Sequence, residues 1–478
     1  SIMGLLPRGA RSSGQILLDG TDILTTSEPD LCKMRGNTMG MVFQEPMTAL
    51  NPVQTIGDQV AETILIHENT SKKQAHKRAT DMLQRVGLDV APSRFPHELS
   101  GGQRQRVVIA MAIVKHPKLL IADEPTTALD VTTQANILTL LKDLVREFDM
   151  GLLLITHDLA VVADVADHIV VMQKGRVVES APTPDLLANM RHPYTRALFD
   201  ASRHQVDLPV HTGCVQLVHA SHIVRDYPAP RKTLFGPRPK FRALDDVSFT
   251  IDRGERVGLV GESGCGKSTL TRALLGLEDV QGGTITLDGA PVFTGKKSNL
   301  TVRRKMQVVF QDPYGSFNPR HRVSRLVSEP WHLLDHPPDN PEARIAAALE
   351  DVGLSASDAS KYIHEFSGGQ RQRIAIARAL IVEPDLIIFD EAVSALDVSV
   401  RAQVLDLISD LCRKRPLAYL FISHDLTVVR SVTDRVLVMK SGQIVEQGAT
   451  ESVFNNPQHP YTQTLLAAAP KLPDFEEA

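Results

Sequence analysis

A set of short motifs occurs twice in this chain, and the repeat constrains the fold more than any other feature. The motifs and their counterparts are Gln44 and Gln311, Ser100-Gly101-Gly102-Gln103 and Ser367-Gly368-Gly369-Gln370, Asp123-Glu124 and Asp390-Glu391, His157-Asp158 and His424-Asp425, and His192-Pro193-Tyr194-Thr195 and His459-Pro460-Tyr461-Thr462. The members of every pair are 267 positions apart (311 − 44 for the first pair, 459 − 192 for the last). Unrelated motifs do not share one separation by chance, so the chain contains two copies of one domain. Its 478 residues also exceed what one hydrophobic core usually supports.

Only the second copy contains a phosphate-binding loop. The stretch Gly261-Glu262-Ser263-Gly264-Cys265-Gly266-Lys267-Ser268-Thr269 fits the pattern of a glycine, four residues and Gly-Lys-Ser/Thr. Further upstream the separation grows to 269 (Asp19-Gly20 and Asp288-Gly289) and then to 272 (Gly4-Leu5 and Gly276-Leu277), so Ser1 aligns with Ala273, which already follows this loop. We therefore expect a first domain over residues 1–205 without its loop and entry strands, through truncation or a natural lesion. We expect an entry strand and a surface loop (Pro228–Lys240) within 206–242, and a second domain over 243–478.

Apolar runs alternate with helical patterns in each copy, which predicts an α/β fold. In the first copy we expect strands at Gln15–Asp19, Met39–Phe43, Leu119–Ala122 and Gly151–Thr156, helices at Arg104–Lys115 and Val131–Phe148, a mostly helical region at Asn51–Gly87, and a hairpin of His168–Gln173 with Arg176–Glu179. Continuous apolar strands separated by helices are typical of a parallel sheet that is covered on both faces.

The composition argues against several classes of function. A net charge of −4 and a pI near 6.5 give no basic footprint for nucleic acid. No apolar run approaches the ~20 residues needed to span a bilayer, and the first seven residues do not have the pattern of a signal peptide. Cys32, Cys214, Cys265 and Cys412 lie far apart, which argues against a zinc or iron–sulfur site and fits a reducing cytoplasm.

The phosphate-loop motif has the flanks that its chemistry requires. Arg256–Val260 is typical of a buried strand, and an amphipathic helix is predicted after the loop, with Leu270, Ala273, Leu274 and Leu277 on its apolar face. Glycines let backbone N–H groups surround phosphate oxygens, and the helix start adds a favourable dipole. Lys267 is expected to reach the outer phosphates and Ser268 to offer its hydroxyl to Mg²⁺. A chance glycine-rich turn is the alternative, which both flanks oppose.

Polar residues follow three apolar strands of the second copy. An apolar strand delivers Asp390 and Glu391 to the carboxyl edge of the sheet, where ligands bind in α/β folds. Asp390 can hold Mg²⁺ there, and Glu391 can polarise the attacking water. His424 is expected to contact the γ-phosphate, and Gln311 to orient water or complete the magnesium shell. The alternatives are a pair of exposed acids that open a loop and a histidine that only caps an element or lies in the core, and the repeat in the first copy disfavours both.

The Ser-Gly-Gly-Gln motif begins a helix in each copy. A small polar residue and two glycines at this position make an anion-binding N-terminus without a lysine. An ordinary N-cap is the alternative, since serine is common there. The twofold occurrence of Ser-Gly-Gly-Gln-Arg-Gln-Arg is more specific than a cap requires.

Together these motifs resemble those of ABC transporter ATPase subunits, over nearly the whole chain. Gly261–Thr269 is similar to Walker A, Leu386–Glu391 to Walker B, Gln311 to the Q-loop, Ser394–Asp397 to the D-loop, His424 to the H-loop, and Leu99–Gln103 and Phe366–Gln370 to the signature. The resemblance implies two tandem P-loop NTPase domains, each with a helical subdomain, that bind ATP and Mg²⁺. Ser268, Gln311 and Asp390 would then be the metal ligands, and Tyr227 would stack on adenine.

In this family two domains pair head to tail, and each ATP lies between the Walker A of one and the signature of the other. For this chain, the resemblance implies an internal pseudo-dimer with one complete site, in which Lys267, Gln311, Glu391 and His424 act on ATP held by Gly261–Thr269. Ser100–Gln103 and Asp130 would close that site. Gln44, Asp123, Glu124 and His157 would surround an incomplete second site, leaving Ser367–Gln370 nothing to close on. Ala392 departs from Pro125 of the first copy and should loosen the turn after Glu391 without abolishing hydrolysis.

The His-Pro-Tyr tails are similar to the C-terminal segment of oligopeptide, dipeptide and nickel importer ATPases, and the tandem arrangement resembles oligopeptide- and microcin-type subunits. The resemblance implies an energy-coupling ATPase of a bacterial importer for short peptides or similar solutes, on the cytoplasmic face of the inner membrane. Its partners would be two transmembrane permease subunits, docked on Asn51–Leu99 and Asn318–Phe366, and indirectly an extracytoplasmic solute-binding protein; no nucleic acid is expected. Alternatives are a soluble ABC ATPase acting on DNA or ribosomes, and an interaction protein with impaired hydrolysis. Alkylation of Cys265 is expected to block nucleotide binding.

Overall fold

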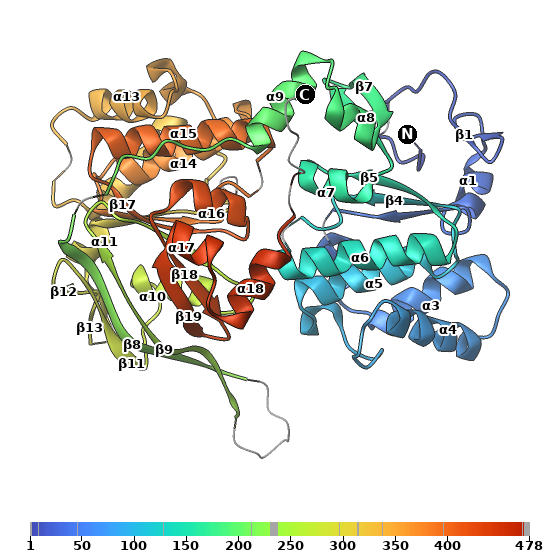
Figure 1. Ribbon diagram of the computed structural model, residues 1–478, viewed down its shortest axis with the longest axis horizontal. Coiled ribbons are helices and arrows are strands. Elements are labelled where there is room, and N and C mark those ends of the chain that lie inside the picture. Colours follow the sequence, from blue (N-terminus) through green and yellow to red (C-terminus); the bar gives the residue numbers. More distant parts are fainter. Residues whose placement is uncertain are drawn as a thin grey trace. The chain divides into compact units, whose positions relative to one another are not determined.

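The chain forms two compact units in the computed structural model (Figure 1). The structure describes residues 2–472 except 8, 45, 128, 212, 230–237, 296, 313–314, 337, 395 and 471. The first unit consists mainly of Ser1–Leu129 and Thr133–Asn189, and the second of Asp130–Thr132 and Met190–Ala469. Ala395 of the expected D-loop and most of the expected surface loop Pro228–Lys240 lie outside the described residues. No described helix has the length and apolar content needed to cross a membrane.

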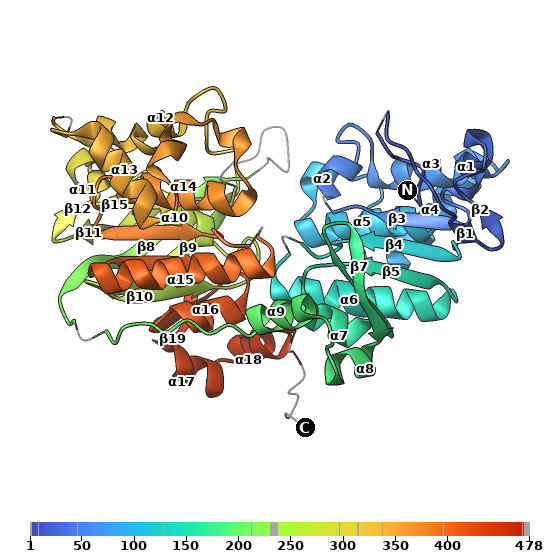
Figure 2. The ribbon, with the colours of Figure 1, turned by 90° about the horizontal axis from the view of Figure 1, so that it is seen from above.

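The second unit is built on a six-stranded sheet of order β15-β16-β17-β10-β18-β19. These strands are β15 (Met306–Val309), β16 (Leu386–Asp390), β17 (Ala418–Ile422), β10 (Arg256–Val260), β18 (Arg435–Lys440) and β19 (Gln443–Ala449). All neighbours are parallel except β19, which is antiparallel to β18. Every residue of β10 and β17 is buried. The expected parallel sheet covered on both faces is thus confirmed, with α15 (Val398–Lys414) running along one side (Figure 2).

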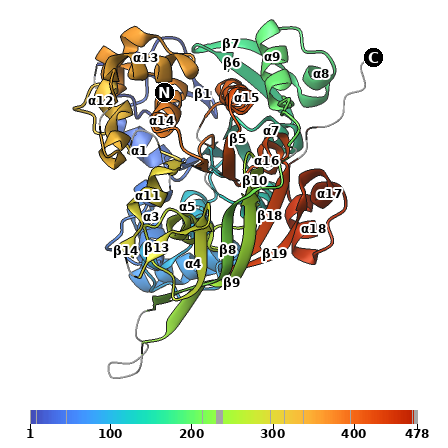
Figure 3. The same cartoon turned by 90° about the vertical axis from the view of Figure 1, so that its left-hand side faces the viewer.

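A second, antiparallel sheet and a helical region complete this unit. The sheet has the order β12 (Ala290–Pro291), β11 (Gly282–Leu287), β8 (Gln216–Pro228) and β9 (Lys240–Asp252), and β13 (Phe293–Thr294) pairs with β14 (Lys297–Ser298). The other helices are α9 (Pro193–Ser202), α10 (Lys267–Leu274), α11 (Leu300–Arg304), α12 (Val323–Val327), α13 (Pro341–Asp351), α14 (Gly368–Leu380), α16 (Leu426–Val432), α17 (Thr450–Asn455) and α18 (Pro460–Ala467), with short 3₁₀ helices η2 (Glu329–Leu333), η3 (Ala356–Ser360) and η4 (Ile363–Glu365). Helices α17 and α18 lie beside the β18–β19 hairpin (Figures 1 and 3).

The first unit repeats only part of this plan. Its strands are β1 (Leu17–Leu18), β2 (Thr21–Asp22), β3 (Met39–Val42), β4 (Leu119–Asp123), β5 (Gly151–Ile155), β6 (His168–Gln173) and β7 (Arg176–Pro182). Its helices are α1 (Glu28–Met34), α2 (Pro46–Ala49), α3 (Ile56–His67), α4 (Lys72–Arg85), η1 (Pro96–Glu98), α5 (Gly101–Ile113), α6 (Val131–Glu147), α7 (Leu159–Val165) and α8 (Thr183–Ala188). Strands β3, β4 and β5 form one parallel sheet, and β6 and β7 form a separate hairpin.

One layer of the second unit has no counterpart in the described part of the first. Strand β10 joins β17 to β18 in the second unit, and α10 and the β8–β9 sheet cover the face beside it. In the first unit the corresponding side chains are solvent-exposed: Leu153 39%, Ile155 45%, Val170 52% and Met172 58%. Their counterparts Leu420, Ile422, Leu437 and Met439 are each 0% exposed. The same strand positions are therefore covered in the second unit and exposed in the described part of the first.

Most expected elements are confirmed, and two differ from the prediction. The strand before the phosphate loop has the expected bounds, and the β6–β7 hairpin turns at Lys174 and Gly175, both with φ in the left-handed region (48° and 75°). The helix after the loop ends at Leu274, because Gly276 adopts a φ of 65°; Leu277 is therefore 50% exposed, and its assignment to the apolar face was wrong. The strand expected at Gln15–Asp19 is reduced to Leu17–Leu18, which pairs only with β2.

Candidate nucleotide site

Neighbouring strands of the second unit end together at one edge of the sheet. The register places Asp390 of β16 and Leu259 of β10 opposite Ile422 of β17. It also places Val309 of β15 opposite Phe389. The residues that follow these strands include Gln311, Glu391, His424 and Gly261, so the sheet brings the four expected motifs to the same edge.

The phosphate loop connects β10 to α10 through a backbone that only glycine adopts easily. Gly266 has a φ of 117°, and a Cβ there would lie 2.6 Å from the carbonyl oxygen of Ala243. The ammonium group of Lys267 is buried and donates to the carbonyl oxygens of Gly261 (2.7 Å) and Glu262 (2.9 Å). The loop therefore closes on its own lysine, while Ser268 lies exposed at the helix start.

The acidic pair at the end of β16 occupies a charged, half-buried position. Burial, then the neighbouring charge of Glu391, raises the pKa of Asp390, although Lys267 opposes the shift. Burial also disfavours ionisation of Glu391, but the interactions with His424 and the charge of Lys267 outweigh it and lower the pKa of this carboxyl. The His424 Nδ1 atom lies 3.7 Å from Glu391 Oε2. The arrangement keeps one carboxylate charged beside a second that resists ionisation.

Glu391 also has an unusual backbone. Its φ is 51°, and its N–H donates to the carbonyl oxygen of Ile422 at 2.9 Å. Its counterpart Glu124 has a φ of 46° and donates in the same way to Ile155 at 2.8 Å. A non-glycine residue in this region costs free energy, so its occurrence at both equivalent positions points to a functional constraint on the glutamate.

The first unit assembles the equivalent polar residues more closely. Gln44 Nε2 donates to Glu124 Oε2 at 2.6 Å, and His157 Nδ1 lies 3.0 Å from Glu124 Oε1. The hydrogen bond with His157 comes first among the causes that lower the pKa of Glu124, while burial raises the pKa of Asp123. Gln311, the counterpart of Gln44, is exposed. The glutamine–glutamate–histidine cluster therefore exists in the first unit without a phosphate loop among the described residues.

The signature serines form real N-caps. Ser100 Oγ accepts from the Gln103 N–H (3.3 Å), and Gln103 Oε1 accepts from the Ser100 N–H (3.0 Å), which makes a capping box at the start of α5. Ser367 and Gln370 repeat it at α14 with distances of 3.4 and 3.0 Å. Both serines therefore cap their helices, as the alternative interpretation expects. This capping leaves the hydroxyl hydrogen of each serine free for another acceptor, because the oxygen serves as the acceptor in the cap.

The two signature glycines have different surroundings. A Cβ on Gly102 would lie 2.4 Å from Thr133 Cγ2, and one on Gly369 would lie 2.1 Å from Val400 Cγ1. The second glycine of each motif therefore permits close helix packing. A Cβ on Gly101 would approach nothing nearer than 3.6 Å, and one on Gly368 would meet nothing within 4 Å.

Two further assigned residues take part in local contacts. Tyr227 lies near the end of β8, where its hydroxyl donates to Glu278 and the Arg225 guanidinium lies 4.9 Å from its ring centroid. The Arg225 guanidinium therefore already covers one face of the Tyr227 ring. Asp130, at the start of α6, accepts from the Thr132 hydroxyl at 2.8 Å.

The sequence motifs did not assign Tyr461 to the site, yet it contacts the phosphate loop. Its hydroxyl oxygen accepts the N–H of Glu262 at 2.9 Å. The repeated His-Pro-Tyr motif contains this tyrosine, but in the sequence it indicated only a resemblance to peptide and nickel importer ATPases, not a contact with the loop.

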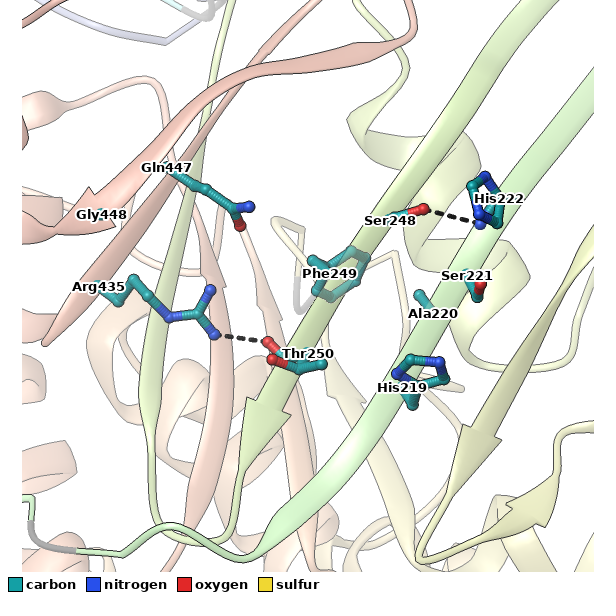
Figure 4. A pocket seen from close by; sticks show the side chains of 10 residues that line it. All are labelled: His219, Ala220, Ser221, His222, Ser248, Phe249, Thr250, Arg435, Gln447 and Gly448. Carbon is teal, nitrogen blue, oxygen red and sulfur yellow. Dashed lines mark hydrogen bonds between the residues drawn. The ribbon is translucent and has the colours of Figure 1, made fainter.

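A separate cavity of about 510 Å³ lies between the β8–β9 and β18–β19 hairpins (Figure 4). Its lining includes Arg435, whose guanidinium already donates to Glu255 and to the carbonyl oxygen of Thr250, both at 2.6 Å. None of the expected nucleotide-site residues lines it. The cavity is therefore distinct from the candidate site.

Comparison with known proteins identifies the family. A family model described as "ABC transporter" matches residues 1–127 and 244–394, and one described as "Oligopeptide/dipeptide transporter, C-terminal region" matches 178–206 and 445–477. The glutathione import ATP-binding protein GsiA of Shigella boydii serotype 4 is 46% identical over 487 residues, covering 94% of this chain and 78% of that protein. The protein of the same name from Escherichia coli (strain K12) is 46% identical over 485 residues, with the same coverage.

Solved structures that match this chain cover about half of it. One from Clostridium perfringens, part of an ABC transporter complex, is 27% identical over 51% of this chain and 92% of its own, with a TM-score of 0.44. The repeated motifs and the matched family models agree on ATP hydrolysis coupled to import. The chain belongs to the ABC transporter family, in which it is an ATP-hydrolysing, energy-coupling subunit of an importer.

Proposed function

We propose that the second unit holds ATP at Gly261–Thr269 and that Glu391 polarises the water that attacks the γ-phosphate. The observation that carries the proposal is the sheet register, which brings Glu391 and His424 to the edge where the phosphate loop begins. The left-handed backbone at Glu391 and Glu124 adds support, because strain of this kind concentrates at functional positions.

The reaction needs positioning and electrostatic stabilisation more than covalent chemistry. Lys267 exchanges the loop carbonyl oxygens for the β- and γ-phosphates. The ionised Glu391 accepts a proton from the attacking water, and His424 holds this carboxylate while contacting the γ-phosphate. Gln311 turns in from its exposed position to orient the water. Tyr227 offers its free ring face to adenine.

Oxygen donors near the loop suit a magnesium ion. Ser268 and Asp390, with Gln311, would hold Mg²⁺ through a hydroxyl, a carboxylate and an amide oxygen. Among the described residues no cluster of three or more His, Cys, Asp or Glu forms a metal cage. In the proposed magnesium site, water and phosphate oxygens would complete the shell. When bound, the ion would neutralise charge that develops on the phosphates.

The Ser100–Gln103 segment closes this site in our proposal. The support is chemical. Ser100 caps the 13-residue helix α5 with its side-chain oxygen, and Gly101, the first residue of the helix, has room around it. Such a terminus suits a γ-phosphate. Asp130 lies alongside, and the two copies act as an internal pseudo-dimer. Gln44, Asp123, Glu124, His157 and Ser367–Gln370 belong to a second site in this proposal.

The transported solute is a short peptide or a similar small molecule. The 46% identity to a glutathione import protein and the matched oligopeptide/dipeptide segment support it. Two transmembrane permease subunits dock on the helical regions Asn51–Leu99 and Asn318–Phe366, and a solute-binding protein acts through them. Exposed apolar side chains in the first region, Val53 (79% exposed) and Ile66 (70%), suit such a contact. The chain then works at the cytoplasmic face of the membrane.

Steady-state ATPase of the purified chain tests the proposal. Glu391→Gln keeps the shape of the side chain and removes the base, so kcat should fall by about 10²–10⁴ while ATP binding persists. Glu350→Gln, an exposed glutamate on α13, is the matched control and should hydrolyse ATP at the unmodified rate. Equal rates for Glu391→Gln and the unmodified chain would refute the assignment.

A further inference from the structure

The His-Pro-Tyr segment of the second unit contacts the phosphate loop directly. Tyr461 is buried (5% exposed) in α18, and its hydroxyl oxygen accepts the backbone N–H of Glu262 at 2.9 Å. Glu262 is the second residue of the loop, and its carbonyl oxygen accepts from Lys267 Nζ at 2.9 Å. One residue of the loop is therefore held at both its amide and its carbonyl group, by the tyrosine and by the lysine.

Each residue of the motif contributes to the placement of that hydroxyl. His459 caps α18 by accepting the Tyr461 N–H on Nδ1 at 3.1 Å, and Pro460 occupies the first helical position, where no N–H is required. The Lys440 ammonium lies 4.7 Å from the centroid of the tyrosine ring. The motif thus fixes both the start of the helix and the direction of the tyrosine side chain.

The segment is also attached to the sheet that carries the loop. The carboxylate of Glu446, on β19, accepts the N–H groups of Gln458 (2.8 Å) and His459 (3.0 Å). Strand β19 pairs with β18, and β18 pairs with β10, which leads into the loop. The Tyr461–Glu262 hydrogen bond therefore ties α18 to the phosphate loop, while the β18–β19 hairpin ties α18 to β10, the strand that precedes the loop.

We propose that Tyr461 is a positioning residue for nucleotide binding, which holds the start of the phosphate loop in the conformation that receives the phosphates. The inference rests on the proposed function, since it requires nucleotide at Gly261–Thr269. Without the hydroxyl, the Glu262 amide loses its acceptor, and the carbonyl group of the same residue, one of the two to which Lys267 donates, is held less firmly. Loosening at this position weakens nucleotide binding because the loop must then be ordered by the ligand itself.

Tyr461→Phe in the full chain removes the hydroxyl and keeps the ring. We expect the Kd for MgADP and the KM for MgATP to rise about five- to tenfold, the range set by one lost hydrogen bond, with kcat changed less than twofold. The repeat supplies a matched control: Tyr194→Phe removes the equivalent hydroxyl from the first copy, where His192 caps its helix in the same way. This control should bind MgADP as the unmodified chain does.

Two further measurements separate positioning from general destabilisation. Glu446→Gln weakens the attachment of α18 without touching the tyrosine, and should raise the Kd in the same direction but less. Binding is measured well below the unfolding temperature of each ligand-free variant, where a purely structural effect would lower Tm and leave Kd unchanged. Unmodified affinity in both Tyr461→Phe and Glu446→Gln would overturn the inference. Failure of the unmodified chain to bind MgADP would instead overturn the proposed function on which the inference rests.

Discussion

Replacement of Gly266 by alanine should damage the phosphate loop more than the backbone strain alone requires. Its φ of 117° lies in the region that disfavours side chains, at a cost of about 1–2 kcal/mol. The added Cβ would also lie 2.6 Å from the Ala243 carbonyl oxygen and 3.3 Å from side-chain atoms of Leu244 and Met439. A backbone carbonyl cannot turn aside as a side chain can, so overpacking adds about 1–3 kcal/mol.

Gly289 provides the matched control in the same unit. Its φ is 74°, and a Cβ there would meet nothing within 4 Å. Gly289→Ala therefore places a side chain in the left-handed region without a steric clash against neighbouring atoms. Urea unfolding of both variants should show Gly266→Ala about 1–3 kcal/mol less stable than Gly289→Ala. The displaced loop should also raise the Kd for MgADP at least tenfold, whereas Gly289→Ala should bind normally. Equal stability and equal affinity in the two variants would refute the steric argument.

Two other predictions follow from burial and charge. Burial raises the pKa of the Cys265 thiol, and the residue is only 6% exposed. Iodoacetamide should therefore modify Cys265 more slowly than the exposed Cys32, and bound ATP should slow the modification of Cys265 further. Mass spectrometry that shows equal labelling of the two thiols would contradict this prediction. The hydrogen bond from Arg78 and then that from Lys115 lower the pKa of Glu68 from 4.5 to about 2. Because the folded-state pKa is depressed, this stabilisation is present above pH 4.5 and is lost as the pH falls towards 2, an effect of about 1–2 kcal/mol after allowance for solvent screening. The protection factors of the α3–α4 amides, which correct the exchange rates for their intrinsic dependence on pH, should fall over that window in the unmodified chain. A Glu68→Gln variant whose protection factors fall equally would contradict the prediction.

The sequence predicted the parts of the fold that depend on short patterns. The strand Arg256–Val260 and the hairpin across Lys174-Gly175 follow from apolar runs and turn residues, which act locally. The repeat transferred each prediction from one copy to the other. The repeat also pairs the exposed Leu153 and Met172 with the buried Leu420 and Met439, a difference in burial that the sequence pattern of these strands does not show.

Tertiary contacts between distant residues could not be predicted from local sequence patterns. The bond between Tyr461 and Glu262 joins residues 199 positions apart, and no local pattern specifies it. Helix α9 shows the same limit: the repeat assigns it to the first copy, yet it belongs to the second unit, where the neighbouring His204 lies 2.6 Å from Asp406. Such contacts depend on how whole elements pack, not on the motif itself.

The most direct test of the central claim is to place a carboxylate at the start of each signature helix in turn. Gly101→Glu and Gly368→Glu are matched by the repeat, and a Cβ at either position meets no atom within 3.5 Å, so neither should disturb the fold. If the first copy closes over ATP that the second copy binds, Gly101→Glu should lower the ATPase kcat at least tenfold through repulsion of the γ-phosphate, and Gly368→Glu should retain most of it. Full activity in Gly101→Glu, or an equal loss in both variants, would contradict the account.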